Sequence, residues 1–124
     1  MCRLRLLPLL CLSLHAEVSF NRDIRPILSD TCFRCHGPDQ SSRMAGLRLD
    51  LRNEAIAPRR AGASIVPGDP KNSLIIQRIE ATGPRLMPPA SAHKTLTAAQ
   101  KQLLTQWVAE GAQFVVLFDL NSVV

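Results

Sequence analysis

The stretch Cys32-Phe33-Arg34-Cys35-His36 decides how this chain folds and what it binds. Two cysteines are separated by two residues, and a histidine follows the second cysteine directly. Two thiols about one helical turn apart can reach both vinyl groups along one edge of a porphyrin, and the adjacent imidazole can then reach the iron. The spacing therefore predicts that a c-type haem is attached to Cys32 and Cys35, with His36 as the proximal iron ligand.

Other uses of these cysteines fit the sequence less well. Once residues 1–16 are set aside as a signal, the chain has no further cysteine, and His36 and His93 are the only histidines. A zinc site would need two more soft ligands, and this spacing matches no common zinc finger. A thioredoxin-like pair would need a βαβ unit, and the chain shows no good run of strands. A structural disulfide remains an alternative, but it gives His36 no role.

The N-terminus has the pattern of an export signal. Residues 1–5 carry two arginines, residues 6–14 form an apolar run too short to span a bilayer, and Ala16 suits a cleavage site. The alternative is a short buried helix. We expect residues 1–16 to be a secretory signal peptide and the mature chain to lie in the periplasm or another extracytoplasmic space, with no stable membrane span.

The mature length and composition fit one small domain built around a cofactor. About 108 residues remain, enough for one domain. The chain has one Trp, four Phe and no Tyr, so a porphyrin would supply much of the apolar core. The net charge falls from +5 to +3 without Arg3 and Arg5, and no basic stripe with stacking aromatics indicates nucleic acid.

The hydrophobic spacing predicts an all-α fold. A helix is expected over residues 23–35, with Asp23 as N-cap and Gly37 as a left-handed C-cap before Pro38. Asp50 is expected to cap a short helix over residues 51–57. Asp69-Pro70 predicts the start of a helix over residues 71–80, and Thr97 with Gln100 predicts a capping box for the last helix, which Gly111 ends. The helix over residues 23–35 and the residues before it have an apolar face of Phe20, Ile24, Ile27 and Leu28. The helix over residues 71–80 has Leu74, Ile75 and Ile79 on its apolar face, and the last helix has Leu103, Leu104, Trp107 and Val108.

A second axial ligand is expected in the loop over residues 82–93. Met87 stands there before two prolines, which would hold its sulfur with little loss of entropy, and a thioether binds haem iron well. Met44 and His93 are the rival ligands, and a Met in a loop can also act as an apolar filler. The prediction is His36 and Met87 as the two iron ligands.

Several motifs in order resemble one known family. They are FNRDIRPIL at residues 20–28, CFRCHGPD at 32–39, GLRLD at 46–50, IVPG at 65–68, SLI at 73–75, MPP at 87–89 and the segment 96–112. Together they are similar to the planctomycete-type cytochrome c domain over residues 18–112. The resemblance implies a small all-α cytochrome c fold around one covalent haem on Cys32 and Cys35, with His36 and Met87 as ligands.

Two features of the chain differ from that family. Arg59-Arg60-Ala61-Gly62 stands where the family tends to have a Gly-rich stretch, so a loop near the haem would be reshaped. Family members also commonly continue into long additional domains. We therefore assign residues 17–112 to the cytochrome domain and residues 113–124 to an apolar tail. The tail could form an edge strand, cover an apolar patch or be a truncated linker to another domain. We favour the truncated linker.

The predicted function is electron transfer by an exported monohaem cytochrome. No paired carboxylate, activated nucleophile or phosphate loop indicates an enzyme. The alternatives are a haem domain of a larger redox enzyme and a sensor or peroxidase-like protein with an open distal site. A set of arginines suggests an acidic redox protein as partner, because a basic rim around a haem edge would steer such a protein to it. The alternative is that they form a solvated face, with one or two of them contacting the haem carboxylates. They are Arg22, Arg25, Arg34, Arg43, Arg48, Arg52, Arg59 and Arg60.

Overall fold

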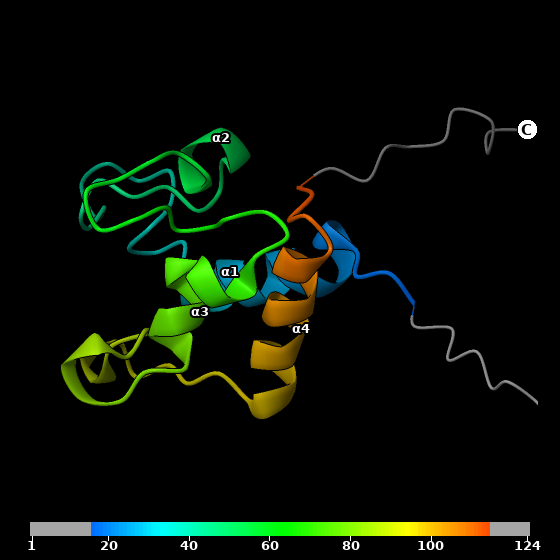
Figure 1. Cartoon of the computed structure of the whole chain (residues 1–124). Helices are drawn as coiled ribbons and strands as arrows, with labels where there is room; N and C mark the ends of the chain where they lie inside the picture. The colour runs from blue at the N-terminus through cyan, green and yellow to red at the C-terminus, as the bar shows by residue number, and fades with distance from the viewer. Residues whose placement is uncertain (1–15, 115–124) are drawn as a thin grey trace, which may run out of the picture.

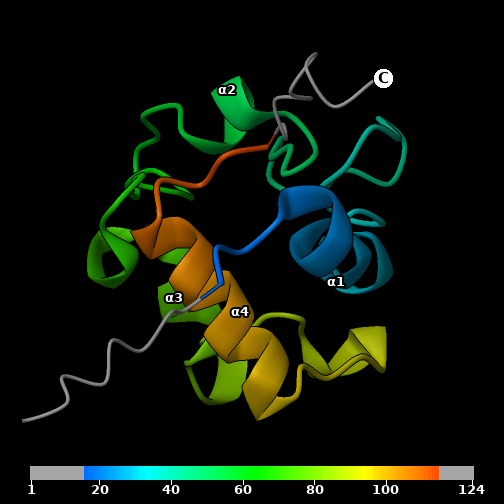
Figure 2. The same ribbon diagram turned by 90° about the vertical axis from the view of Figure 1, so that its right-hand side faces the viewer.

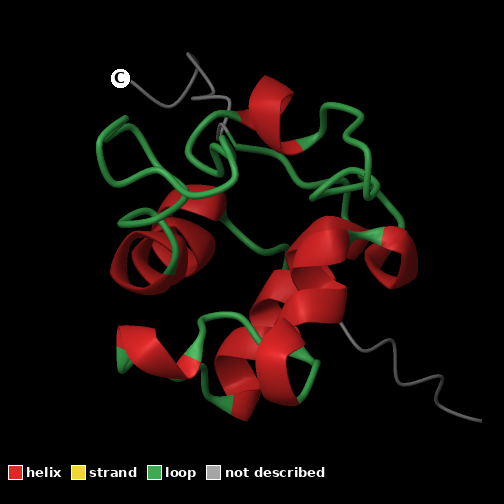
Figure 3. Ribbon diagram, turned by 90° about the vertical axis from the view of Figure 1, so that its left-hand side faces the viewer, coloured by secondary structure: helices red, strands yellow, loops and turns green. Residues whose placement is uncertain are grey.

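The computed structural model describes residues 16–114, and within that range it contains helices and loops but no β-strand (Figure 3). The α-helices are α1 (Arg25–Thr31), α2 (Arg52–Ala55), α3 (Leu74–Ile79) and α4 (Ala98–Ala109). The short π and 3₁₀ turns are η1 (Phe20–Ile24), η2 (Pro70–Asn72), η3 (Gly83–Arg85) and η4 (Ala90–Ala92). The predicted all-α fold is confirmed.

Helix α1 starts differently from the sequence prediction. The π-helical turn η1 comes first, and its N-cap is Ser19, whose hydroxyl accepts the N–H of Arg22; the N-cap of α1 itself is Ile24, so the assignment of Asp23 as N-cap was wrong. The Asp23 carboxylate instead accepts the N–H of Ser19 at 2.9 Å. The wider π turn precedes Pro26, which cannot donate a backbone hydrogen bond and would crowd the carbonyl four residues earlier in a regular helix.

Two other predicted helices are shorter than expected. Helix α2 has Leu51 as its N-cap and no side-chain cap, because the Asp50 carboxylate pairs with Arg48 at 2.6 Å instead. This ion pair also holds the pKa of Asp50 below its usual value. Asp69 does cap a helical start, but that start is the 3₁₀ turn η2, and the chain leaves the helical region at Ser73 before α3 begins. The predicted helix over residues 71–80 is therefore two elements.

Helix α4 agrees with its prediction. Thr97 and Gln100 form the capping box, with Thr97 Oγ1 accepting the Gln100 N–H at 3.1 Å and Gln100 Oε1 accepting the Thr97 N–H at 2.9 Å. Gly111, at a φ of 106°, follows the end of the helix. Both signals are local in the sequence, so no distant contact competes with them.

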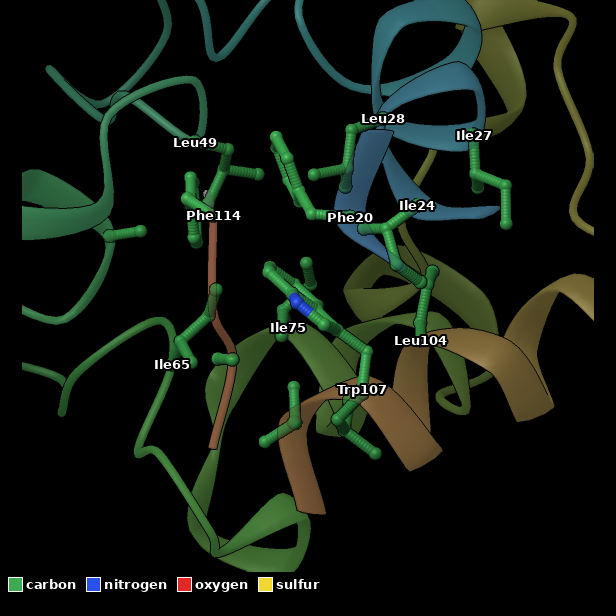
Figure 4. Close-up of a cluster of buried hydrophobic side chains, with 14 of the residues drawn as sticks. Phe20, Ile24, Ile27, Leu28, Leu49, Ile65, Ile75, Leu104, Trp107 and Phe114 are labelled. Carbon is green, nitrogen blue, oxygen red and sulfur yellow. The ribbon is translucent and has the colours of Figure 1, made fainter. Parts of the chain in front are cut away.

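The main core lies where α4 packs against η1 and α3 (Figure 4). Trp107 on α4 is buried with its ring centre 5.7 Å from that of Phe20, which confirms that it packs against the N-terminal helix. The ring of Phe114 stacks on that of Phe20, with the ring centres 4.7 Å apart. Phe114, which we assigned to the tail, therefore belongs to this core. Residues 1–15 and 115–124, which include nearly all of the predicted signal and most of the predicted tail, lie outside the described residues.

The remaining loops lie on two sides of the helices. In Figures 1 and 2 the loop that carries α2 and the loop over residues 82–93 lie at opposite ends of the molecule, with α1 and α3 between them. Segments from both loops contribute to one cavity, described below. Between residues 16 and 114, no helix has the length and apolar character needed to cross a membrane.

Candidate cofactor site

One cavity of about 260 Å³ lies among the C-terminal end of α1, α3 and the two loops. This volume is close to the lower end of the range for ligand and cofactor sites, about 300–1,000 Å³. Cys32, Cys35, His36 and Met87 all line it. The structure thus brings together in one place the four residues that the sequence predicted as haem-binding residues, although Met87 is 51 residues from His36 in the chain.

The cysteine motif forms a single turn at the end of α1. The Cys32 N–H donates to the Leu28 carbonyl at 2.8 Å, and the His36 N–H donates to the Cys32 carbonyl at 2.9 Å. Helix α1 itself ends at Thr31, because Cys32 has a φ of −123°, so the predicted helix through Cys35 was wrong. The turn still keeps the two thiols and the imidazole on one wall of the cavity.

Gly37 ends this turn for a reason other than the predicted one. Its φ is not positive, so it is not a left-handed C-cap. A Cβ at this position would instead lie 2.1 Å from the carbonyl oxygen of Phe33. Only glycine lets the backbone return this closely to the motif, and a sequence pattern cannot distinguish this need from a C-cap.

We therefore expect Gly37→Ala to lower the stability of the haem-loaded protein by about 1–3 kcal/mol, the usual cost of forcing an extra group into packed structure. Urea unfolding followed by far-ultraviolet circular dichroism would measure this loss. Pro38→Ala is the control, because Pro38 is exposed and adjacent, and its effect should stay within about 1 kcal/mol. Equal losses in the two variants would contradict the role of the close approach to Phe33.

His36 is held so that one ring nitrogen stays available. Its Nδ1 lies 3.2 Å from the Met44 carbonyl oxygen, and a carbonyl can only accept, so Nδ1 carries the proton. Nε2 then carries the lone pair that an iron ligand needs. Burial lowers the pKa of His36; the hydrogen bond to Met44 raises it, and the positive charge of Arg59 lowers it again. Together these effects favour the neutral form of the imidazole.

The environment of Cys32 does not have the character of a catalytic redox thiol. Burial raises the pKa of Cys32, with a smaller opposite effect of the Thr31 hydroxyl. Reactive CxxC cysteines have lowered pKa values, so this environment disfavours a thioredoxin-like role. Cys32 and Cys35 are both free thiols. Within residues 16–114 no group of three or more His, Cys, Asp or Glu side chains lies together as a metal site would need.

The position of Met87 in the fold distinguishes it from its rivals. Met87 is half-buried between η3 and η4, and its N–H donates to the Arg78 carbonyl of α3 at 3.0 Å. Pro88 and Pro89 line the same cavity. Met44 is 61% exposed and His93 is also exposed, and neither lines the cavity. Of the three candidates, only Met87 faces the space that His36 lines.

The rest of the cavity lining combines apolar side chains with two arginines. Leu47, Leu49, Leu74, Ile75 and Ile79 supply apolar surface. Arg59 and Arg78 are the cationic residues among those that line the cavity. The sequence reasoning assigned Leu74 to the core and did not single out Arg78. Their positions on α3 show no local signal that they face a cavity, because α3 presents apolar side chains on more than one side.

Most of the arginines that suggested a docking surface have partners within the chain. Arg22 pairs with Asp23, and Arg48 pairs with Asp50. Three others donate to backbone carbonyls: Arg43 to Gly37 and Pro38, Arg52 to Gly111 and Ala112, and Arg59 to Ala45. The three that bind carbonyls therefore hold loops in place, and a docking role would rest mainly on Arg25, Arg34 and Arg60.

Comparison with known proteins gave one family match, over the segment that carries the cysteine motif. The model of the family Planctomycete cytochrome C matches residues 32–91, from the first cysteine of the motif to η4. The matched segment contains Cys32, Cys35, His36 and Met87 and nearly all residues that line the cavity. Searches of curated proteins and of solved structures gave no match to the chain.

Proposed function

We propose that this chain, which contains a planctomycete-type cytochrome c domain, is an exported monohaem cytochrome. Domains of this family bind haem c and act in electron transfer. In this proposal Cys32 and Cys35 attach one haem, His36 is the proximal ligand and Met87 the distal ligand. The observation that carries it is the single cavity lined by all four residues, while Met44 and His93 stay outside.

The bound group would supply an iron that cycles between the ferrous and ferric states. The chain's own residues bind, orient and shield. The CxxCH turn holds two thiols and an imidazole on one wall, and the Met44 carbonyl keeps the proton of His36 on Nδ1. The hydrogen bond from Met87 to Arg78 fixes the distal loop on α3, and the leucines and isoleucines of the wall exclude water.

The same arrangement supports a carrier rather than a catalyst. If both His36 and Met87 bound the iron, they would leave it no open position for a substrate, gas or peroxide. Cytochromes of this kind typically lie outside the cytoplasm, in agreement with the signal predicted at residues 1–16. We propose a redox protein as partner, with Arg25, Arg34 and Arg60 as the cations available to steer an acidic one.

An optical spectrum of the protein, matured with haem-attachment machinery, tests this proposal. A closed site predicts a six-coordinate low-spin spectrum in both oxidation states and slow binding of carbon monoxide to the ferrous form. The slow step would be displacement of the Met87 sulfur. Rapid binding of carbon monoxide by the wild-type protein would instead mean an open distal site, and a sensor or peroxidase-like function would then replace electron transfer.

A further inference from the structure

Arg59 stands at a position where a cation can act on the proximal side of the site. It lies on a turn closed by the Gly62 N–H, which donates to the Arg59 carbonyl at 3.0 Å, and its side chain lines the cavity. Its Nη2 donates to the Ala45 carbonyl, 14 residues away in the chain. The positive charge is close enough to lower the pKa of His36. Arg59 therefore connects two loops beside the imidazole.

The segment that receives this hydrogen bond is a tight turn over residues 44–47. The Leu47 N–H donates to the Met44 carbonyl at 3.2 Å, and the Met44 N–H donates to the Cys35 carbonyl at 2.7 Å. Ala45 and Gly46 have φ values of 55° and 59°, in the left-handed region that an alanine rarely adopts. Such a conformation persists only where surrounding contacts hold it, and the Ala45 carbonyl is the group that Arg59 binds.

The same turn presents the carbonyl that orients the proximal histidine. The Met44 oxygen accepts from His36 Nδ1 at 3.2 Å, one residue before the carbonyl that Arg59 holds. We propose that Arg59 is a positioning residue for His36: it holds the turn over residues 44–47 in place, and the turn keeps the Met44 carbonyl against Nδ1. This inference rests on the proposed function, because it treats His36 as the iron ligand.

The exchange rate of the His36 Nδ1 proton with water, measured by NMR on the ferrous haem-loaded protein, tests the proposal. Arg59→Met keeps an unbranched apolar stem but removes the donors and the charge. We expect it to speed exchange about tenfold, the effect of losing roughly one hydrogen bond. Arg59→Lys restores a cationic donor and should give a rate between those of Arg59→Met and the wild type.

Two controls separate positioning from loss of charge and from general instability. Arg60→Met removes one charge from the neighbouring exposed residue, which does not line the cavity, and should leave the exchange rate unchanged. The indole N–H of Trp107, which donates to the Gln113 carbonyl at 2.9 Å in the core, reports global opening and should not accelerate in Arg59→Met.

The proposal is overturned if the His36 Nδ1 proton of Arg59→Met exchanges at the wild-type rate. It is also overturned if the Trp107 indole proton of Arg59→Met accelerates equally, or if Arg60→Met accelerates exchange of the His36 proton to the same extent. Failure of the proposed function would show differently. In that case the wild-type protein would carry no covalent haem on a denaturing gel, whatever residue 59 is. Haem attachment with no effect of Arg59→Met would refute the positioning role alone.

Discussion

Replacing Cys32 and Cys35 together by serine is expected to abolish covalent haem attachment and to leave the chain largely unfolded. A serine hydroxyl does not form the thioether bond to a vinyl group. The described core is small, and the apolar walls of the cavity would stay exposed to water without the porphyrin. Haem staining of a denaturing gel would measure attachment, and far-ultraviolet circular dichroism would measure the loss of helix.

Cys2→Ser is the matched control, because it removes a cysteine outside the motif and should leave haem attachment at the wild-type level. The wild-type protein provides the decisive comparison. If its haem, after maturation, is released completely into acidified organic solvent, the cysteines do not form thioether bonds and the central assignment fails.

Replacing Met87 by alanine is expected to keep the haem attached while changing the iron site. Cys32, Cys35 and His36 are untouched, so attachment and proximal ligation should persist. Loss of the thioether should remove the weak sulfur-to-iron charge-transfer band in the far red and lower the reduction potential, because a neutral thioether favours the ferrous state. Carbon monoxide should then bind the ferrous form rapidly. Optical spectra and a redox titration would measure these changes.

Met44→Ala and His93→Ala are the controls for the distal ligand. Met44→Ala removes the other methionine sulfur near the site but keeps the backbone carbonyl that His36 contacts. Both controls should keep the wild-type spectrum and potential. A wild-type spectrum in Met87→Ala together with a changed spectrum in His93→Ala would assign bis-histidine ligation instead.

Features that depend on neighbours in the chain were predicted correctly. The capping box of Thr97 and Gln100 and the stop at Gly111 need only the residues between them, and the structure confirms both. The cysteine motif likewise forms one turn with its thiols and imidazole on one wall, although α1 stops at Thr31. The family resemblance, carried by several such local motifs in order, agrees with the family match over residues 32–91.

Predictions failed where a side chain had a choice of partners. Asp23 and Asp50 both looked like helix caps, but Asp23 accepts from Ser19 within a π turn, and Asp50 pairs with Arg48. An Asp before a helical segment is a good cap only if no cation or other donor competes for its carboxylate. Gly37 shows the same ambiguity, because its small size serves a close approach to Phe33 and not a left-handed C-cap.

The sequence alone determined the chemistry that this chain can offer, because the spacing of Cys32, Cys35 and His36 sets which groups one turn presents. From the two prolines the sequence favoured Met87 over Met44 and His93, but it could not show which of the three lines the same cavity as that turn, since each lies on a loop whose course depends on distant contacts. The tertiary structure brings Met87 to the cavity that His36 lines: the Met87 N–H donates to the Arg78 carbonyl on α3, and Met44 contributes its backbone carbonyl to His36. Contacts between residues so far apart in the chain exist only once the helices have packed.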